Sequence, residues 1–140
     1  MTNKYKIFTD GGSRGNPGPA AIGVVIFDLE NDNKLHEISK CLGSATNNIA
    51  EYSAVEAAID WVKEQSDHAV VDFYLDSELV QRQLIGQYKV KDPSLRQIFL
   101  RIREKVIALH GPITFTHVKR EFNADADALL NKALDKPDDI

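Results

Sequence analysis

The chain has 140 residues, of which 43% are hydrophobic and 27% are charged, and its net charge is −4 at pH 7. This length favours a single domain, and the apolar share excludes an intrinsically disordered chain. A single cysteine, Cys41, excludes an internal disulfide, and no apolar run approaches the roughly 20 residues that a bilayer span requires. We therefore expect a cytoplasmic protein that does not enter a membrane.

The charges are segregated along the chain. Residues 80–120 hold nine basic and two acidic residues, whereas the remaining stretches hold eight basic and nineteen acidic residues. A basic sector beside an acidic remainder suits a protein that contacts a phosphate backbone and keeps an acidic metal site. Helices with solvated Lys and Arg on their outer faces would give the same pattern, so charge alone does not decide between the two readings.

The first third of the chain predicts three strands. Polar and apolar residues alternate over Lys4–Thr9, which predicts a strand ending at Asp10, and a turn-rich stretch occupies residues 11–19. The largely apolar run Ala20–Phe27 predicts a second strand, and Lys34–Leu42 a third. The short connections favour an antiparallel meander.

Helical periodicity begins after the third strand. Apolar residues at helical spacing predict an amphipathic helix from Asn48 to Gln65. The remaining predicted elements are a strand over Val70–Leu75, a helix over Ser77–Ile85, a loop over Gly86–Pro93, a helix over Ser94–Leu109, a strand over Ile113–Val118 and a helix over Ala124–Leu134 capped by Asn123. We predict one domain over residues 1–135 and a short acidic tail over residues 136–140.

This element order predicts an α/β fold with a mixed sheet covered by helices. A helix between the third and fourth strands, and helices before the fifth, favour right-handed parallel crossovers. Ligands of such sheets bind beyond the carboxyl ends of the parallel strands. Asp10 and Asp76, each predicted as the last residue of its strand, would lie at that edge.

Two further acidic residues occupy inward-facing helix positions. Glu51 lies on the same helical stripe as Val55, and Asp127 shares a face with Leu130. Carboxylates gathered in one place repel one another and resist ionisation unless a cation lies between them. Oxygen ligands without His or Cys select Mg²⁺ or Mn²⁺ rather than zinc.

Each carboxylate also has a purely structural interpretation. Asn48 and Glu51 fit a capping box, and Asp76 could cap the helix that begins at Ser77. Asp127 could favour the positive end of its helix, and Asp10 could start an Asx turn. Taken singly, these roles are the commoner ones. Four core-facing carboxylates on one edge of a sheet favour the metal site.

Four segments, taken together, resemble a known family. Phe8–Pro19 closely resembles the opening motif of type 1 ribonuclease H, and Thr46–Glu51, Leu75–Ser77 and Arg120–Leu129 resemble its second, third and fourth motifs. They occur in order and at family spacing from Lys4 to Leu134. The short loop Gly86–Pro93 is similar to that of bacterial and archaeal members that lack the basic protrusion between helices.

The resemblance implies a ribonuclease H-like fold, with a five-stranded mixed sheet of strand order 3-2-1-4-5 and helices on both faces. It implies a hydrolase that cuts the RNA strand of RNA–DNA hybrids endonucleolytically and leaves 5′-phosphate and 3′-hydroxyl ends. Asp10, Glu51, Asp76 and Asp127 carry over as catalytic residues and as ligands of two Mg²⁺ ions, with Mn²⁺ as an alternative ion. One metal would activate the attacking water while the other stabilises the departing 3′ oxygen.

The resemblance also implies a set of substrate-binding residues. An RNA strand is told from DNA by its 2′-hydroxyls, which Asn16, Glu51 and the backbone near Ser13 and Gly15 would meet in the minor groove. The expected set outside the carboxylates is Gly11, Ser13, Gly15, Asn16, Thr46, Asn47, Asn48, Tyr88, Lys89 and Lys91. Within it, Thr46 resembles a phosphate contact, Asn47 and Asn48 lie near the DNA strand, and Tyr88, Lys89 and Lys91 approach the DNA backbone. Helix capping by the asparagines and a plain solvated loop are the structural alternatives.

Two features depart from the family pattern. Without the protrusion the chain carries less positive charge, so we expect weak hybrid binding with a steep salt dependence. Many members carry a mobile histidine before the last aspartate, whereas Lys119–Ala124 contains none and His117 lies in the predicted strand. Arg120 and Glu121 are the candidate substitutes.

Two other functions remain open from the sequence. A relative of the same fold could cut DNA or double-stranded RNA, although the residues at the expected 2′-hydroxyl positions disfavour a DNA nuclease. A module that binds hybrids without cutting them would gain nothing from four carboxylates facing phosphates. The hypothesis we carry forward is an Mg²⁺-dependent nuclease that acts on hybrids as a monomer, with no obligate protein partner.

Overall fold

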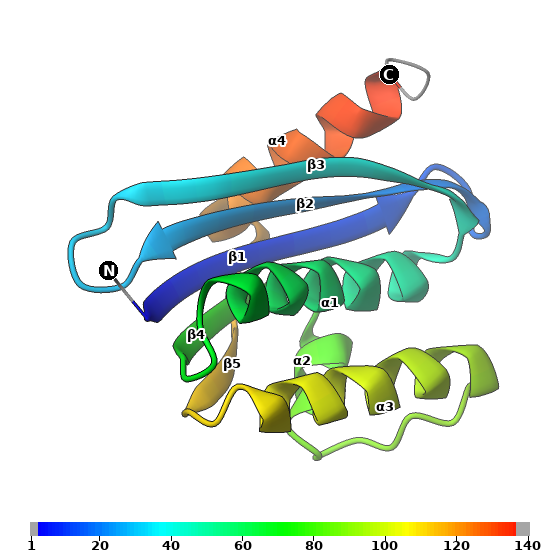
Figure 1. The fold of residues 1–140 in the computed structure, drawn as a ribbon. Helices are drawn as coiled ribbons and strands as arrows, with labels where there is room; N and C mark the ends of the chain where they lie inside the picture. Colours follow the sequence, from blue (N-terminus) through cyan, green and yellow to red (C-terminus); the bar gives the residue numbers. More distant parts are fainter. Residues whose placement is uncertain (1–2, 137–140) are drawn as a thin grey trace.

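The computed structural model describes residues 3–136, which form a five-stranded sheet with helices on both faces (Figure 1). The strands are β1 (Lys4–Ser13), β2 (Gly18–Asp28), β3 (Lys34–Ala45), β4 (Val70–Leu75) and β5 (Ile113–His117). The helices are α1 (Asn47–Gln65), α2 (Glu78–Leu84), α3 (Pro93–Ala108), the 3₁₀ helix η1 (Arg120–Asn123) and α4 (Ala124–Asp135).

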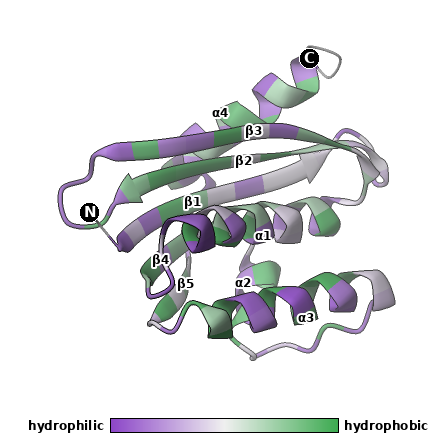
Figure 2. Ribbon diagram, viewed as in Figure 1, coloured by the Kyte–Doolittle hydropathy of each residue, from purple (hydrophilic) through white to green (hydrophobic). Residues whose placement is uncertain are grey.

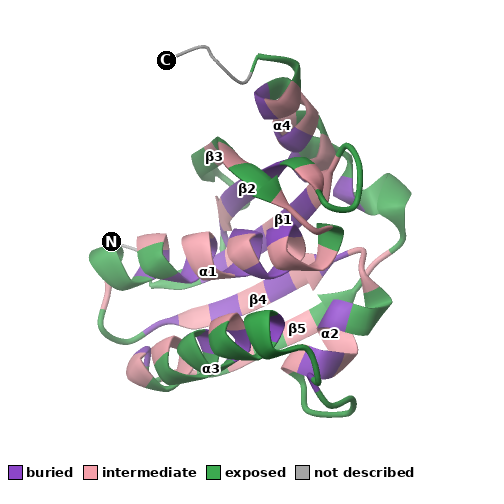
Figure 3. Ribbon diagram, turned by 90° about the vertical axis from the view of Figure 1, so that its right-hand side faces the viewer, coloured by how far each residue is buried: buried purple, intermediate pink, exposed green. Residues whose placement is uncertain are grey.

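The sheet has the strand order β3-β2-β1-β4-β5. Strands β1, β2 and β3 pair antiparallel, whereas β4 pairs parallel with both β1 and β5. This confirms the mixed sheet and the order that the resemblance implied. Helix α1 packs over β1 and β2 with α3 beside it, and α4 packs over β2 and its neighbours from the other side (Figures 1 and 3).

Strand β2 has helices on both of its faces, and its side chains alternate between two cores. Ile22, Val24 and Ile26 point into the large core under α1, whereas Ala21 packs with Leu130 in a small cluster under α4. A strand covered on both faces is apolar throughout, which explains the uninterrupted run in the sequence. On α3, by contrast, hydrophilic and hydrophobic residues alternate as on a helix with one solvent-facing side (Figure 2).

The sequence predicted that β1 ends at Asp10, but the strand continues to Ser13. Its antiparallel ladder with β2 continues from Asp10↔Gly23 to Ser13↔Ala20, so residues that resemble a turn in composition are held extended by their partner strand. Its parallel pairing with β4, however, stops at Thr9↔Leu75. Asp10 is therefore the first residue beyond the parallel pairing and still lies at the expected edge.

Several other boundaries also differ from the predictions. Helix α1 begins at Asn47 after the cap Thr46, rather than at Asn48, and α2 begins after the cap Ser77. Helix α3 starts at Pro93, with Asp92 as its cap. No sequence pattern indicated η1, because a single 3₁₀ turn leaves no periodic pattern.

Within residues 3–136, none of the helices combines the length and the apolar character that crossing a membrane requires. The predicted acidic tail lies outside the described residues apart from Lys136.

Candidate active site

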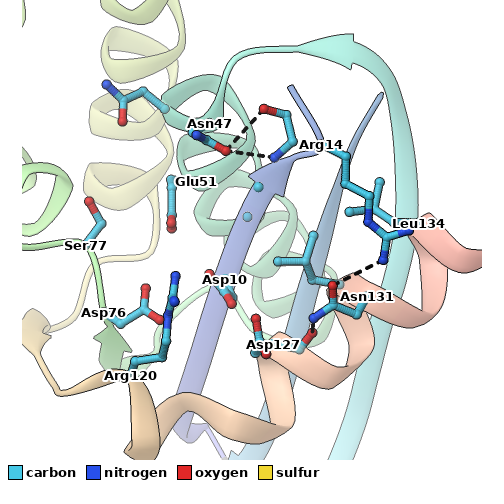
Figure 4. Close-up of a pocket in the computed structure, with 15 residues that line it drawn as sticks. Asp10, Arg14, Asn47, Glu51, Asp76, Ser77, Arg120, Asp127, Asn131 and Leu134 are labelled. Carbon is cyan, nitrogen blue, oxygen red and sulfur yellow. Dashed lines mark hydrogen bonds between the residues drawn. The ribbon is translucent and has the colours of Figure 1, made fainter. Parts of the chain in front are cut away.

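Four carboxylates from four different elements meet in one cavity (Figure 4). Asp10 lies in β1, Glu51 in α1, Asp76 directly after β4, and Asp127 in α4. Asp10, Glu51 and Asp76 each offer a carboxylate oxygen within 4.8 Å of the other two, and Asp127 lies on the other side of Asp10. The cavity measures about 590 Å³. The structure thus brings together all four residues that the sequence singled out.

A close backbone approach places Glu51 beside Asp10. A Cβ atom built on Gly11 would lie 2.2 Å from both the carbonyl carbon and the carbonyl oxygen of Ala50, so β1 and α1 can cross at this distance only with glycine there. Glu51 follows Ala50 on the helix, and Asp10 precedes Gly11 on the strand. Gly11, expected to bind substrate, therefore has a packing role that the sequence analysis did not foresee.

A second close backbone approach, between β2 and α4, sets the position of α4 and therefore of Asp127. A Cβ atom on Gly23 would lie 2.0 Å from the carbonyl oxygen of Ala126 and 2.7 Å from the amide nitrogen of Leu130. Because Gly23 pairs with Asp10 across the sheet, this contact sets the helix directly over the strand pair that carries the site. Asp127 then faces the cavity from the first turn of α4.

The helix caps are supplied by other residues than the carboxylates. The Thr46 hydroxyl accepts a hydrogen bond from the Ile49 amide, and the Ser77 hydroxyl accepts one from Val80. The capping roles considered as structural alternatives for Glu51 and Asp76 are therefore filled by Thr46 and Ser77. One oxygen of each, Oε2 of Glu51 and Oδ2 of Asp76, is buried and has no hydrogen-bond partner among the described residues.

Crowding and burial disfavour the charged forms of these groups. The pKa of Asp10 is raised to about 8 by burial, by the charge of Asp76 and by the neighbouring Asp127 carboxyl. A hydrogen bond from the Gly11 amide lowers this pKa in part. Burial, with the charges of Asp10 and Asp76, also raises the pKa of Glu51 well above its ordinary value, while the Gly11 amide and Arg120 lower it in part.

The residues present fit a divalent cation of the Mg²⁺ type. All the candidate ligands are carboxylate oxygens, two buried oxygens lack a partner in the described part of the chain, and mutual repulsion would be relieved by a positive ion. Asp10, Glu51 and Asp76 would form the inner set, and Asp127 would complete it from the side of α4.

The predicted substrate residues nearest the cavity form one hydrogen-bonded group. The Asn47 side-chain oxygen accepts from the Ser13 amide at 2.8 Å and from the Ser13 hydroxyl at 3.1 Å. The Asn16 side-chain oxygen in turn accepts from the Asn47 amide at 3.1 Å. The group joins the β1–β2 turn, which includes Gly15, to the start of α1. A neighbouring groove of about 440 Å³ continues past Asn48 to the start of α3.

Tyr88, Lys89 and Lys91 lie apart from the carboxylates, in the connection between α2 and α3. The Arg82 guanidinium lies over the Tyr88 ring at 5.5 Å, and the Lys89 carbonyl accepts a hydrogen bond from Gln83 at 3.3 Å. Both lysine side chains are exposed. These residues could reach a long ligand that extends beyond the cavity, but they do not line the cavity itself.

Two arginines, Arg14 and Arg120, also line the cavity, and little in the sequence indicated that they would. Arg120 points toward Asp76 and Glu51, whereas Glu121 lines a different pocket on the sheet (Figure 4). Arg14 reaches across to α4, where it forms an ion pair with Asp135 at 2.7 Å. Only the missing loop histidine gave a reason to consider Arg120, and nothing in the sequence indicated the partner of Arg14.

The chain matches a family model described as "Reverse transcriptase-like" over residues 8–133. Ribonuclease HI of Halobacterium salinarum is 42% identical over 130 residues, which cover 91% of this chain and 63% of that protein. Bifunctional protein Rv2228c of Mycobacterium tuberculosis is 39% identical over 133 residues, which cover 94% of this chain and 36% of that protein. The chain thus spans about a third of the mycobacterial protein and less than two thirds of the halobacterial one.

Solved structures show the same architecture. LC11-RNase H1, isolated from compost, is 46% identical with a TM-score of 0.89, and the match covers 97% of this chain and 99% of that one. The crystal structure of LC11-RNase H1 in complex with an RNA/DNA hybrid matches with a TM-score of 0.88 at 45% identity, over 95% of this chain and 98% of that one.

Proposed function

Since the chain belongs to the type 1 ribonuclease H family, we propose that it cleaves the RNA strand of RNA–DNA hybrids as a metal-dependent endonuclease. One observation carries the proposal: carboxylates from four separate elements converge in one cavity and leave buried oxygens without partners. The complex of LC11-RNase H1 with a hybrid supports the choice of substrate.

Asp10, Glu51, Asp76 and Asp127 would hold two Mg²⁺ ions, or Mn²⁺ in their place. When bound, the ions supply activation of the attacking water and stabilisation of the departing 3′ oxygen, which leaves a 5′-phosphate. The carboxylates fix the ions on rigid elements, because β1, α1 and the end of β4 all belong to the main core. Arg120, which faces this cavity, would lie near the phosphate and offset its negative charge.

Selection of RNA would rest on Asn16, Glu51 and the backbone near Ser13 and Gly15. The Asn47 side-chain oxygen accepts hydrogen bonds from the amide and the hydroxyl of Ser13, and the Asn16 side-chain oxygen accepts one from the Asn47 amide. The polar groups that would meet a 2′-hydroxyl are therefore held in place before the substrate binds. Thr46, Asn47 and Asn48 line the neighbouring groove, where Thr46 would contact a phosphate and the two asparagines would lie near the DNA strand.

The DNA strand would lie farther out, toward the connection between α2 and α3. Tyr88, Lys89 and Lys91 are exposed there, and the two lysines belong to the excess of basic residues over 80–120. We further propose that residues 1–135 form the catalytic domain and act as a monomer in the cytoplasm.

The test is a cleavage assay on labelled RNA–DNA hybrid, double-stranded RNA, single-stranded RNA and duplex DNA, with and without Mg²⁺. We expect cleavage of the RNA strand of the hybrid only when a divalent ion is present. Asp10→Asn and Asp76→Asn should abolish it. Asp72→Asn is the matched control, because this carboxylate lies on β4, the strand that ends directly before Asp76, but it accepts a hydrogen bond from Thr114 and does not line the cavity.

Each arm has an outcome that contradicts part of the proposal. Near wild-type cleavage by Asp10→Asn or Asp76→Asn would refute the assignment of the site. Cleavage of duplex DNA at a comparable rate would refute recognition of the 2′-hydroxyl. Binding of the hybrid without a cut strand under any divalent ion would show a recognition module rather than an enzyme.

A further inference from the structure

Asn123 is buried at the start of α4, where the sequence predicts a helix cap, yet its side chain does something else. Its amide nitrogen donates a hydrogen bond to the carbonyl oxygen of Thr9 at 2.8 Å, and the residue is only 1% exposed. It makes no side-chain cap bond to α4. Its side-chain oxygen has no hydrogen-bond partner within residues 3–136. A buried amide that leaves one atom unpaired is costly, so a gain elsewhere must balance it.

This hydrogen bond joins the two backbone segments that carry Asp10 and Asp127. Thr9 immediately precedes Asp10 in β1 and is itself fully buried. Asn123 lies four residues before Asp127, which is about one helical turn. The two carboxyl groups that the bond brings together are close enough for Asp127 to raise the pKa of Asp10.

Asp127 depends on such a link more than the other carboxylates do. Asp10, Glu51 and Asp76 each offer a carboxylate oxygen within 4.8 Å of the other two. Among the described residues, Asp127 is not part of this compact set. It comes from α4, which packs on the other side of the sheet against a small cluster (Figures 3 and 4). Its position therefore follows from how α4 is seated.

Other side chains also bond to carbonyls of α4, but farther along the helix. The Ser39 hydroxyl donates to the Leu129 carbonyl at 2.6 Å, and the Cys41 thiol donates to the Ala133 carbonyl at 3.1 Å. Both come from β3, which is separated from β1 by β2. They hold the helix against the edge of the sheet, whereas the Asn123 bond holds its start against the strand of Asp10.

We infer that Asn123 is a positioning residue, which sets Asp127 opposite Asp10 so that both carboxylates can bind the same metal ion. The inference rests on the proposed metal-dependent function but concerns a residue that contacts neither metal nor substrate. Residues that orient metal ligands typically contribute 10- to 100-fold to metal affinity.

The experiment compares Asn123→Ala and Asn123→Leu with wild type and with Ser39→Ala. Leucine keeps the branched shape and the number of side-chain heavy atoms and removes the unpaired oxygen, so together with the smaller alanine it guards against a variant that fails to fold. Ser39→Ala is the matched control, because it also removes one side-chain bond to α4. Circular dichroism and thermal unfolding establish folding, calorimetric titration with Mn²⁺ alone measures metal affinity, and hybrid cleavage across Mg²⁺ concentrations gives kcat and KM.

Both Asn123 variants should bind Mn²⁺ at least tenfold more weakly and need correspondingly more Mg²⁺ for half-maximal cleavage, with KM for the hybrid little changed. Ser39→Ala should lower only the melting temperature. Wild-type Mn²⁺ affinity in folded Asn123 variants would overturn the inference, as would an equal loss in Ser39→Ala. If wild type cut no hybrid while the Asn123 variants still lost Mn²⁺ affinity, the proposed function would fail and the positioning role would stand.

Discussion

The close contact between Gly23 and α4 predicts that a larger residue at this position displaces the helix, and the structure gives the size of the displacement. In Gly23→Ala the new Cβ atom would lie 2.0 Å from the Ala126 carbonyl oxygen, and side-chain carbons do not approach closer than about 3.0 Å. Helix α4 must therefore move away from β2 by about 1 Å or more. The displaced atoms are backbone atoms of the helix, so a change of rotamer cannot absorb the shift.

Two measurable effects should follow from this displacement. The overpacked contact should lower the free energy of unfolding by about 1 to 3 kcal/mol. Because Asp127 follows Ala126, the carboxylate should move with the helix, and a misplacement of about 1 Å can reduce the rate about 100-fold. Thermal unfolding measures the first effect, and single-turnover cleavage of an RNA–DNA hybrid at saturating Mg²⁺ measures the second.

Gly43→Ala separates lost stability from lost geometry. Gly43 has a φ of +79° and no atom within 4 Å of its built Cβ position, so alanine there is strained without touching α4. This variant should unfold at a lower temperature and cleave at the wild-type rate. Wild-type stability of Gly23→Ala would refute the close packing of α4. If Gly23→Ala were less stable but cleaved at the wild-type rate, the position of Asp127 would not depend on how α4 packs against β2.

Three further predictions concern other parts of the molecule. Burial raises the pKa of Glu56, but hydrogen bonds from two cations of α3 outweigh it and leave the pKa below its ordinary value of 4.5. The stabilisation is therefore present above pH 4.5 and lost as the pH falls through the folded-state pKa. In urea unfolding, Glu56→Gln should be about 1 kcal/mol less stable at pH 7 and converge with wild type in acid. Arg120→Ala should lower kcat for hybrid cleavage at least tenfold while Glu121→Ala leaves kcat unchanged, because Arg120 lines the cavity and Glu121 does not. Equal losses of kcat in the two variants would contradict this prediction. Lys91→Ala should raise KM and reduce the slope of log KM against log salt by about one, and an unchanged slope would exclude a phosphate contact.

The sequence predicted the elements better than their ends. Alternation and helical spacing located all five strands and the four α-helices, because those patterns reflect which faces are buried. The end of β1 was wrong, since Asp10 to Ser13 are rich in glycine and are held in the ladder only by pairing with β2. Such pairing is a tertiary effect that local composition does not encode.

The sequence was sufficient to identify the carboxylates of the site, but not the backbone contacts that position them. The carboxylates could be identified because each stands where a core-facing element begins or ends, and the family resemblance supplied the strand order. The roles of Gly11 and Gly23 could not be read from the sequence, because each depends on a helix that crosses the strand at that residue. Asn123 does stand at the N-cap position of α4, as predicted, but its side chain bonds to Thr9 rather than to the helix, and the sequence could not show this because Thr9 lies 114 residues away in the chain.

The carboxylates are held together by backbone contacts rather than by attraction, and this has a consequence for stability. Without a metal ion, repulsion and burial act against the folded state, as the raised pKa of Asp10 shows. Asp10→Asn replaces an ionisable group, whose charged form is disfavoured at this site, with a neutral amide, and it leaves the backbone contacts around Gly11 unchanged. In EDTA this inactive variant should therefore be more stable than wild type, by about 1 to 2 kcal/mol. Added Mg²⁺ should raise the melting temperature of wild type and have little effect on the variant. Asp72→Asn, whose side-chain oxygen can still accept the hydrogen bond from Thr114, removes a carboxylate outside the cavity and should gain no stability. A melting temperature of Asp10→Asn below that of wild type in EDTA would mean that the carboxylates do not repel one another as their spacing requires.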